Sequence, residues 1–327
     1  MAYKPLLILA GGSGYLGRLL IESLKDRYSF LVLGRAESSS IKTAYHPYPK
    51  DAKALAPHLD GALALINLAG KSVDCRYTEK NKQAILHSRV DTTNYLGKAM
   101  AACKTPPSVW VNLSSATIYP DSQVVQTERS ATPGGNFSEE VCLAWEKAFY
   151  DAHIPGTRKV VLRSGLVFGK KGGAYPVLEK LAKLCLGGKQ GSGTQYMSVL
   201  HEADFTRAIE HVIHNRCMGT YNLCIPQPIR NKDFMRMLAS YQHQLPQLRQ
   251  TPWMIKLGAI VLRTEAELVL KSRCVIPERL LNEGFQFKYE NPEKILEGLN
   301  VPYFHSAEKE SASGSTGNFV LASTSSS

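Results

Sequence analysis

The chain has 327 residues, of which 44% are hydrophobic and 20% are charged, and its formal net charge is +11. This length and this share of hydrophobic residues are enough for a sizeable core in one large or two medium domains. The chain contains no run of about 18 uninterrupted apolar residues, so we expect no membrane span. Its seven cysteines are scattered without a C-x-x-C pair, which predicts reduced thiols, with neither a disulfide framework nor a metal site.

The start of the chain and its basic charge narrow the class further. A core strand begins almost at once, without the charged, apolar and cleavage regions of a targeting leader, which predicts a cytoplasmic protein. No Lys/Arg block or nucleic-acid-binding motif occurs, so we expect no nucleic-acid partner. The positive charge is densest over 158–189. That stretch either faces a phosphorylated ligand or forms a solvated basic surface.

The first motif is a glycine-rich turn between a strand and a helix. The apolar run 6–10 is followed by glycines in the pattern G-x-x-G-x-x-G, and leucines at helical spacing come next. Gly11 suits a sharp turn, Gly14 leaves room for a phosphate, and Gly17 lets the helix lie close to the sheet. The helix N-terminus offers free N–H groups and a partial positive charge to a pyrophosphate. We therefore predict dinucleotide contacts at Gly11, Ser13, Gly14, Tyr15, Leu16 and Gly17.

Arg35 indicates which dinucleotide binds. It ends the second predicted strand, 30–35, about 20 residues after the glycine turn, where an acidic residue would hold the ribose hydroxyls of NAD. A guanidinium cannot accept a hydrogen bond from a 2′-hydroxyl, but it suits a 2′-phosphate. The sequence therefore favours NADP(H) over NAD, the alternative being a surface arginine at a strand end.

The next strand and helix add further candidate contacts. The apolar run 62–68 ends in small residues, and Leu68, Ala69 and Gly70 suit the close approach of an adenine and a ribose. In the predicted helix 79–103, Arg89 lies on the same face as apolar residues and must find a partner, since a buried unpaired charge is costly. A cofactor phosphate and a structural salt bridge are both open as that partner.

Hydroxyl groups follow the predicted strand 108–114. Ser115 and Tyr119 lie just beyond its carboxyl end, which is where open α/β sheets bind ligands. They are our candidates for binding or polarising a carbonyl oxygen. A helix over 138–152 and a strand over 159–163 follow.

The order of the predicted elements along the chain indicates an α/β fold of the Rossmann type. Strands that alternate with helices predict a doubly wound parallel sheet with right-handed crossovers. Later segments predict a smaller, mostly helical C-terminal lobe over its carboxyl edge. Asp204 opens a helix and complements its dipole, and Asn231 is expected to cap another. We predict an NADP-binding domain over 1–169, to whose sheet a strand near 219–224 returns, and a substrate lobe over 170–305. Within the lobe, helices are predicted over 252–262 and 264–271. The serine-rich tail over 306–327 is expected to be disordered.

Several motifs together resemble the extended short-chain dehydrogenase/reductase superfamily, and within it the subgroup called epimerase family or nucleoside-diphosphate-sugar epimerase-like proteins. The resemblance runs from about Leu6 to Gly298. The motifs are Gly-Gly-Ser-Gly-Tyr-Leu-Gly at 11–17, Asn-Leu-Ala-Gly at 67–70, Ser-Arg-Val at 88–90, Arg-Ser-Gly-Leu-Val-Phe-Gly at 163–169, Gly-Ser-Gly-Thr-Gln-Tyr-Met-Ser at 191–198, His201-x-x-Asp204 and Val-Ile-Pro-Glu-Arg-Leu-Leu at 275–281.

The resemblance implies NADP(H) in the N-terminal domain. It places the three glycines at the pyrophosphate, Arg35 at the 2′-phosphate, and Leu68 and Ala69 beside the adenosine half. Arg89 would approach the cofactor, and Val167 would lie near the nicotinamide. Ser115 matches the superfamily's active-site serine.

One departure from the superfamily separates two functions. Catalytic members carry Tyr-x-x-x-Lys, in which the lysine and the cationic nicotinamide depress the phenol pKa so that it can move a proton. None of the 15 tyrosines here has a lysine four residues later, and Ser138 and Cys142 stand where the pair would be.

Two functions remain open. The first hypothesis is an NADP(H)-dependent oxidoreductase or epimerase that acts on a small polar carbonyl or carbinol substrate, an anionic sugar nucleotide among the candidates. The second is a non-catalytic NADP(H)-binding redox sensor or scaffold. A homodimer is compatible with both.

Overall fold

The computed structural model describes residues 3–35, 43–242, 246–252, 254–255 and 270–299. The predicted tail and most of the two helices expected over 252–271 lie outside the described residues. The strands are β1 (Leu6–Ala10), β2 (Ser29–Gly34), β3 (Ala44–Pro47), β4 (Ala64–Asn67), β5 (Val109–Ser115), β6 (Ser122–Gln126), β7 (Arg158–Ser164), β8 (Leu166–Gly169), β9 (Gly172–Gly173), β10 (Tyr196–Met197), β11 (Val199–His201), β12 (Gly219–Leu223), β13 (Ile229–Arg230) and β14 (Arg273–Val275). The helices are α1 (Tyr15–Leu24), η1 (Ala52–Leu55), α2 (Ala56–Leu59), α3 (Glu79–Ala101), η2 (Ala116–Ile118), α4 (Phe137–Asp151), α5 (Tyr175–Lys183), α6 (Glu202–His214), α7 (Asn231–Tyr241), α10 (Glu278–Asn282) and α11 (Pro292–Gly298).

Seven parallel strands form the central sheet, in the order β12-β7-β5-β4-β1-β2-β3. The order reverses between β1 and β4, where the chain leaves one half of the sheet for the other. In open α/β sheets a ligand binds at the carboxyl ends of the strands at such a reversal. The predicted Rossmann-type parallel sheet is therefore confirmed, and its reversal point lies beside the glycine-rich turn.

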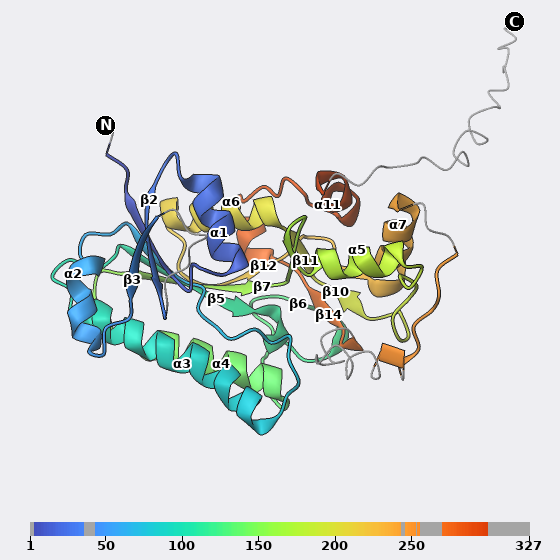
Figure 1. The fold of residues 1–327 in the computed structure, drawn as a ribbon, viewed down its shortest axis with the longest axis horizontal. Coiled ribbons are helices and arrows are strands. Elements are labelled where there is room, and N and C mark those ends of the chain that lie inside the picture. Colours follow the sequence, from blue (N-terminus) through green and yellow to red (C-terminus); the bar gives the residue numbers. More distant parts are fainter. Residues whose placement is uncertain (1–2, 36–42, 243–245, 253, 256–269, 300–327) are drawn as a thin grey trace, which may run out of the picture.

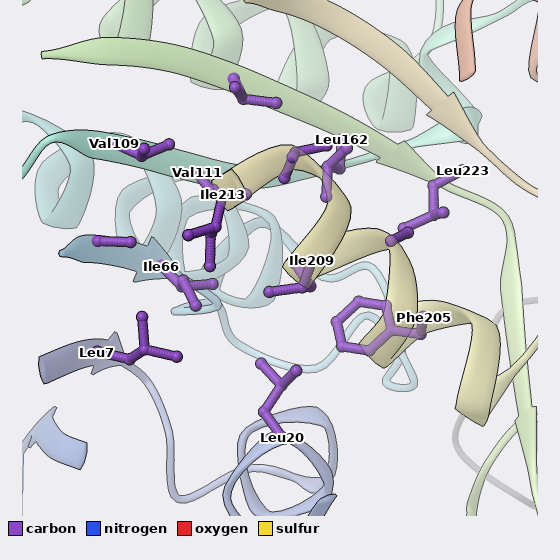
Figure 2. Packing of buried hydrophobic residues seen from close by; sticks show 14 of the residues in the cluster. Leu7, Leu20, Ile66, Val109, Val111, Leu162, Phe205, Ile209, Ile213 and Leu223 are labelled. Carbon is purple, nitrogen blue, oxygen red and sulfur yellow. The ribbon is translucent and has the colours of Figure 1, made fainter. Parts of the chain in front are cut away.

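Helices cover both faces of this sheet because its strands alternate apolar side chains between them. Leu7 and Leu9 of β1 pack on one side with Phe205 and Ile209 of α6, and α1 joins them there (Figure 2). Ile8 faces the opposite cluster, with residues of α2, α3 and α4. Figure 1 shows α1 and α6 on one side of the sheet and the long α3 and α4 side by side on the other.

A second, smaller lobe stands beyond the carboxyl ends of β7 and β12, which lead directly into its strands β8 and β13. Its core gathers aromatic and aliphatic side chains of α5, α7 and α11, among them Tyr175, Phe234 and Leu296. Three short sheets accompany these helices, β10-β13, β11-β8-β9 and β14-β6. In Figure 1, α5, α7, β10 and β14 lie together at the end of the molecule opposite β2 and β3. The lobe thus adjoins the carboxyl edge of the sheet, as predicted.

The long predicted elements begin and end within a few residues of the observed ones, but one predicted cap is wrong. Arg230 has the extended backbone of the N-cap of α7, and Asn231 is the first helical residue. The Asn231 side chain instead accepts a hydrogen bond from the Gln190 amide at 2.9 Å and donates to the Gln190 side chain at 2.8 Å. It pins the 187–193 loop to the lobe. None of the described helices is long and apolar enough to cross a membrane.

Candidate functional site

The glycine-rich turn presents an open helix N-terminus. Gly11 has a φ of +75°, and a Cβ there would lie 2.7 Å from the Ala69 Cα, so the turn and the end of β4 touch through backbone atoms. A Cβ at Gly17 would overlap the Gly12 carbonyl, whereas one at Gly14 would meet nothing nearer than 3.6 Å. Among the residues that the structure describes, no side chain caps α1. The turn therefore has both the space and the free N–H groups that an anionic group requires.

Arg35 follows directly on β2 at the same edge of the sheet, and its side chain is exposed. β2 is the neighbour of β1, so this guanidinium is one strand away from the glycine-rich turn. The residue is available to an anion that lies over the ends of these two strands.

A buried hydrogen-bond network of side-chain amides and hydroxyls holds the segment that follows β4. Asn67 donates to Thr93 at 3.1 Å and to Asn112 at 2.8 Å, and its oxygen accepts from the Ala69 amide at 3.1 Å. The Trp145 indole donates to the same Thr93 hydroxyl at 2.9 Å. These bonds hold the backbone at 68–70 against the turn.

Arg89 reaches this segment from α3. Its guanidinium lies against Gly70, where a Cβ would be 3.1 Å from Cζ, and stacks over Trp145 at 5.2 Å from the ring centroid. It donates to the Lys71 and Ile85 carbonyls at 3.0 and 3.1 Å. Burial lowers the pKa of Arg89, and among the described residues no carboxylate lies within ion-pair distance of it. Within the described residues, Arg89 therefore forms no salt bridge, and its charge is available to a bound anion.

Ser115 ends β5, and its hydroxyl oxygen is held by Thr117. It accepts from the Thr117 amide at 3.2 Å and from the Thr117 hydroxyl at 3.0 Å. A serine hydroxyl has two acceptor sites and one proton, so the Ser115 proton remains to be donated elsewhere. Thr117 contacts the Cys142 thiol of α4 at 3.5 Å. Burial raises the pKa of Cys142, which keeps it a neutral thiol rather than a base.

Tyr119 lies nearby in the sequence but faces the core. Its side chain is fully buried. Its hydroxyl donates to Asn222 at 2.8 Å and accepts from Arg163 at 2.9 Å. Burial raises the Tyr119 pKa, against the opposing charge and hydrogen bond of Arg163. This geometry is structural, and it does not bring the phenol to the Ser115 hydroxyl.

Arg163 is the centre of a buried polar cluster beneath the site. Its guanidinium binds both Glu146 oxygens, at 2.9 and 2.8 Å. Ser114 donates to the same carboxylate at 2.6 Å. Burial alone would lower the Arg163 pKa, but the hydrogen bonds and charge of Glu146 raise it instead. The cluster joins β5, β7 and α4 through fully partnered charges.

The remaining motif residues have mainly architectural roles. His201 caps α6 by accepting from the Ala203 amide at 3.1 Å, and Asp204 accepts from the amides of Lys288 and Tyr289 at 2.9 and 2.8 Å. Ser198, which ends the 191–198 motif, donates to the Arg273 carbonyl at 2.7 Å. These contacts tie the lobe together.

The basic stretch 158–189 begins with charges that serve the fold. Arg158 donates to three carbonyls at the end of α6 and in the loop that follows it, those of Val212, Ile213 and Cys217. Arg163 is also buried in an ion pair, so both arginines of this stretch serve the fold.

Val167 lies on β8, next to Tyr15. Two further residues, Thr117 beside Ser115 and Glu202 beside Tyr15, were not among the predicted site residues. Val167 is buried and pairs in register with Leu200 of β11. Thr117 was detectable as a hydroxyl two residues after Ser115, a spacing typical of a serine turn. Glu202 carried no local signal, because its contact with Tyr15 joins residues 187 apart in the sequence.

Two family models match the sequence. Residues 7–224 match a model described as the NAD dependent epimerase/dehydratase family, and residues 252–299 match a domain of unknown function (DUF1731). The chain is 32% identical over 298 residues to an epimerase family protein of Staphylococcus epidermidis, covering 89% of this chain and 98% of that protein. It is 30% identical over 303 residues to the epimerase family protein YfhF of Bacillus subtilis, covering 90% and 97%.

Solved structures give a consistent comparison. The human epimerase family protein SDR39U1, determined with NADPH, superposes with a TM-score of 0.80 at 27% identity over 90% of this chain and 98% of that one. A nucleoside-diphosphate sugar epimerase of Corynebacterium glutamicum gives a TM-score of 0.72 at 27% identity over 91% of this chain and 58% of that one.

Proposed function

This chain belongs to the NAD-dependent epimerase/dehydratase family, and on that premise we propose that it binds NADP(H) and acts on the carbonyl or carbinol carbon of a small polar substrate. The observation that carries the proposal is a pair of cations at the dinucleotide edge, exposed Arg35 and half-buried Arg89, for which the described part of the chain supplies no carboxylate partner. Both flank the open N-terminus of α1.

The residues present suit the two charged parts of this dinucleotide. The pyrophosphate would lie over Gly14, with the N–H groups of the first turn of α1 as donors. Arg35 would hold the 2′-phosphate, for which a guanidinium is well suited. Leu68 and Ala69 would lie by the adenosine half, and Val167 by the nicotinamide half. The human neighbour determined with NADPH supports the same choice.

Ser115 is the proposed substrate contact. A bound nicotinamide would supply the hydride chemistry. Ser115 would use its one uncommitted O–H to donate a hydrogen bond to the substrate oxygen, since Thr117 occupies its acceptor sites. Tyr119 has a positioning role in this scheme, because its hydroxyl is committed to Asn222 and Arg163. A sugar nucleotide is one candidate substrate, which the similarity to the nucleoside-diphosphate sugar epimerase of Corynebacterium glutamicum supports.

The test is a titration with NADPH, followed by incubation of the complex with carbonyl compounds and sugar nucleotides. We expect tight NADPH binding, and either loss of the reduced-nicotinamide absorbance or an epimerised product. Ser115→Ala should then lower kcat by about 10²–10³-fold, the effect of losing a donor to a developing oxyanion. Ser240→Ala, at an exposed serine of α7, is the matched control and should leave kcat unchanged. Failure of the wild-type protein to bind NADPH would overturn the proposal.

A second function, an NADP(H)-binding redox sensor or scaffold without turnover, is favoured by a specific observation. The α4 positions of the Tyr-x-x-x-Lys pair hold Ser138 in place of the tyrosine proton donor and Cys142, a buried thiol with a raised pKa, in place of the lysine. The nearby phenol of Tyr119 is buried and hydrogen-bonded. Tight NADPH binding with no product from any compound in the panel would favour this function.

A further inference from the structure

The Tyr15 side chain leaves the glycine-rich turn and enters the neighbouring lobe. Tyr15 is the first residue of α1 and follows directly on Gly14. Its hydroxyl donates a hydrogen bond to Glu202, the first residue of α6. Burial, followed by the hydrogen bond and charge of Glu202, raises the Tyr15 pKa, so the phenol stays protonated and remains the donor.

Glycines of the β8–β9 hairpin shape a cradle for this ring. A Cβ at Gly169 would overlap the Tyr15 hydroxyl, and one at Gly172 would overlap the ring. At Gly173, with a φ of +71°, a Cβ would overlap the Val167 carbonyl, so that glycine serves the hairpin itself. Only residues without side chains at 169 and 172 admit the tyrosine.

Glu202 joins the same hairpin to the turn. It accepts from the Lys170 amide at 3.4 Å as well as from Tyr15. It is held in place by β11, whose last residue, His201, caps α6 and pairs with Phe168 of β8. One carboxylate therefore contacts both the turn and the hairpin that carries Val167.

We propose that Tyr15 and Glu202 are positioning residues that hold the β8–β9 hairpin against the glycine-rich turn and thereby retain bound NADP(H). The retention of the nucleotide rests on the function proposed above. Its pyrophosphate would lie at one end of the Tyr15 ring and its nicotinamide beside Val167 on the hairpin. While the Tyr15–Glu202 hydrogen bond is formed, the glycine-rich turn and the β8–β9 hairpin stay together, and the nucleotide is released only after this hydrogen bond breaks.

The experiment is a double-mutant cycle read by the rate of NADPH release in stopped flow. Tyr15→Phe keeps the ring in its cradle and removes only the hydroxyl, while Glu202→Leu removes the acceptor. A hydrogen bond to a charged group predicts release about tenfold faster or more in each single variant. The double variant should be no faster than the faster single one, because both changes break one contact. Unchanged release in Tyr15→Phe, or additive effects in the double variant, would overturn the inference.

Tyr28→Phe is the matched control. The Tyr28 hydroxyl contacts Glu210 at 3.2 Å and also His214, so it too ties the α1 side of the sheet to α6, from the segment between α1 and β2 and away from the turn. We expect NADPH release to be unchanged in this variant. An equal effect there would mean that α1–α6 packing in general controls release, which contradicts a specific role for Tyr15.

Hydrogen exchange separates this inference from the proposed function. Without nucleotide, Tyr15→Phe should increase amide exchange at Lys170 and at Ala174, which donates to the Val167 carbonyl at 3.0 Å. Unchanged exchange would overturn the contact's role in holding the hairpin. A wild-type protein that shows this protection but binds no NADPH would overturn the proposed function and the retention of nucleotide, and leave the hairpin contact standing.

Discussion

Arg35→Asp should weaken NADPH binding by about 100-fold or more while changing NADH binding far less. The substitution removes a charge-assisted contact to the 2′-phosphate, about 1.5–3 kcal/mol, and adds repulsion from a carboxylate. Every 1.4 kcal/mol is tenfold in Kd. NADH has hydroxyls instead of that phosphate, and an aspartate can accept from them. Isothermal titration of both nucleotides measures the two constants.

Arg216→Asp is the control for the change of two charge units. Arg216 is exposed and precedes β12, so it stands at the amino edge of the sheet, opposite the proposed site. It should alter the NADPH Kd by no more than a long-range electrostatic effect that salt screens. Equal losses of NADPH and NADH affinity in Arg35→Asp would show that Arg35 does not read the 2′-phosphate.

Arg163→Met should lower the free energy of unfolding by about 3–5 kcal/mol, because it leaves the Glu146 carboxylate buried without its counter-ion. The side chains of Arg163 and Glu146 are only 10% and 8% exposed, and the guanidinium also supports the Tyr119 hydroxyl. Urea denaturation followed by circular dichroism gives the change, from the midpoint and slope of the transition.

A double variant and a surface variant give this stability prediction its controls. Arg163→Met with Glu146→Leu should lose much less than the two single variants added together, since an apolar pair leaves no buried charge. Lys147→Met breaks an exposed pair with Asp151 on the same helix, 2.6 Å apart, and should cost about 0.5 kcal/mol or less. If Arg163→Met proved as mild as Lys147→Met, the buried pair would contribute little to stability.

The long elements were predictable because their signals are local. The apolar runs in the predicted strands 6–10 and 108–114 are too short for helices and end in turn residues, which favours strands, and the glycines at 11, 14 and 17 favour a turn by the absence of side chains. The short strands of the smaller lobe, such as β9 and β10 with two residues each, were not predictable. A pair of residues carries no periodicity, and β10 is a strand only because β13, from a distant segment of the chain, lies beside it.

The sequence by itself determined the parallel α/β fold, the glycine-rich turn and the place of Arg35 at the end of β2, since each depends on residues close together along the chain. Only the tertiary structure decided that the Tyr119 phenol is buried against Arg163, that Asn231 binds Gln190 instead of capping a helix, and that Tyr15 reaches Glu202. These partners are between 41 and 187 residues apart. A polar side chain takes its role from the donors and acceptors that folding brings within about 3 Å of it, and that neighbourhood is not written in local spacing.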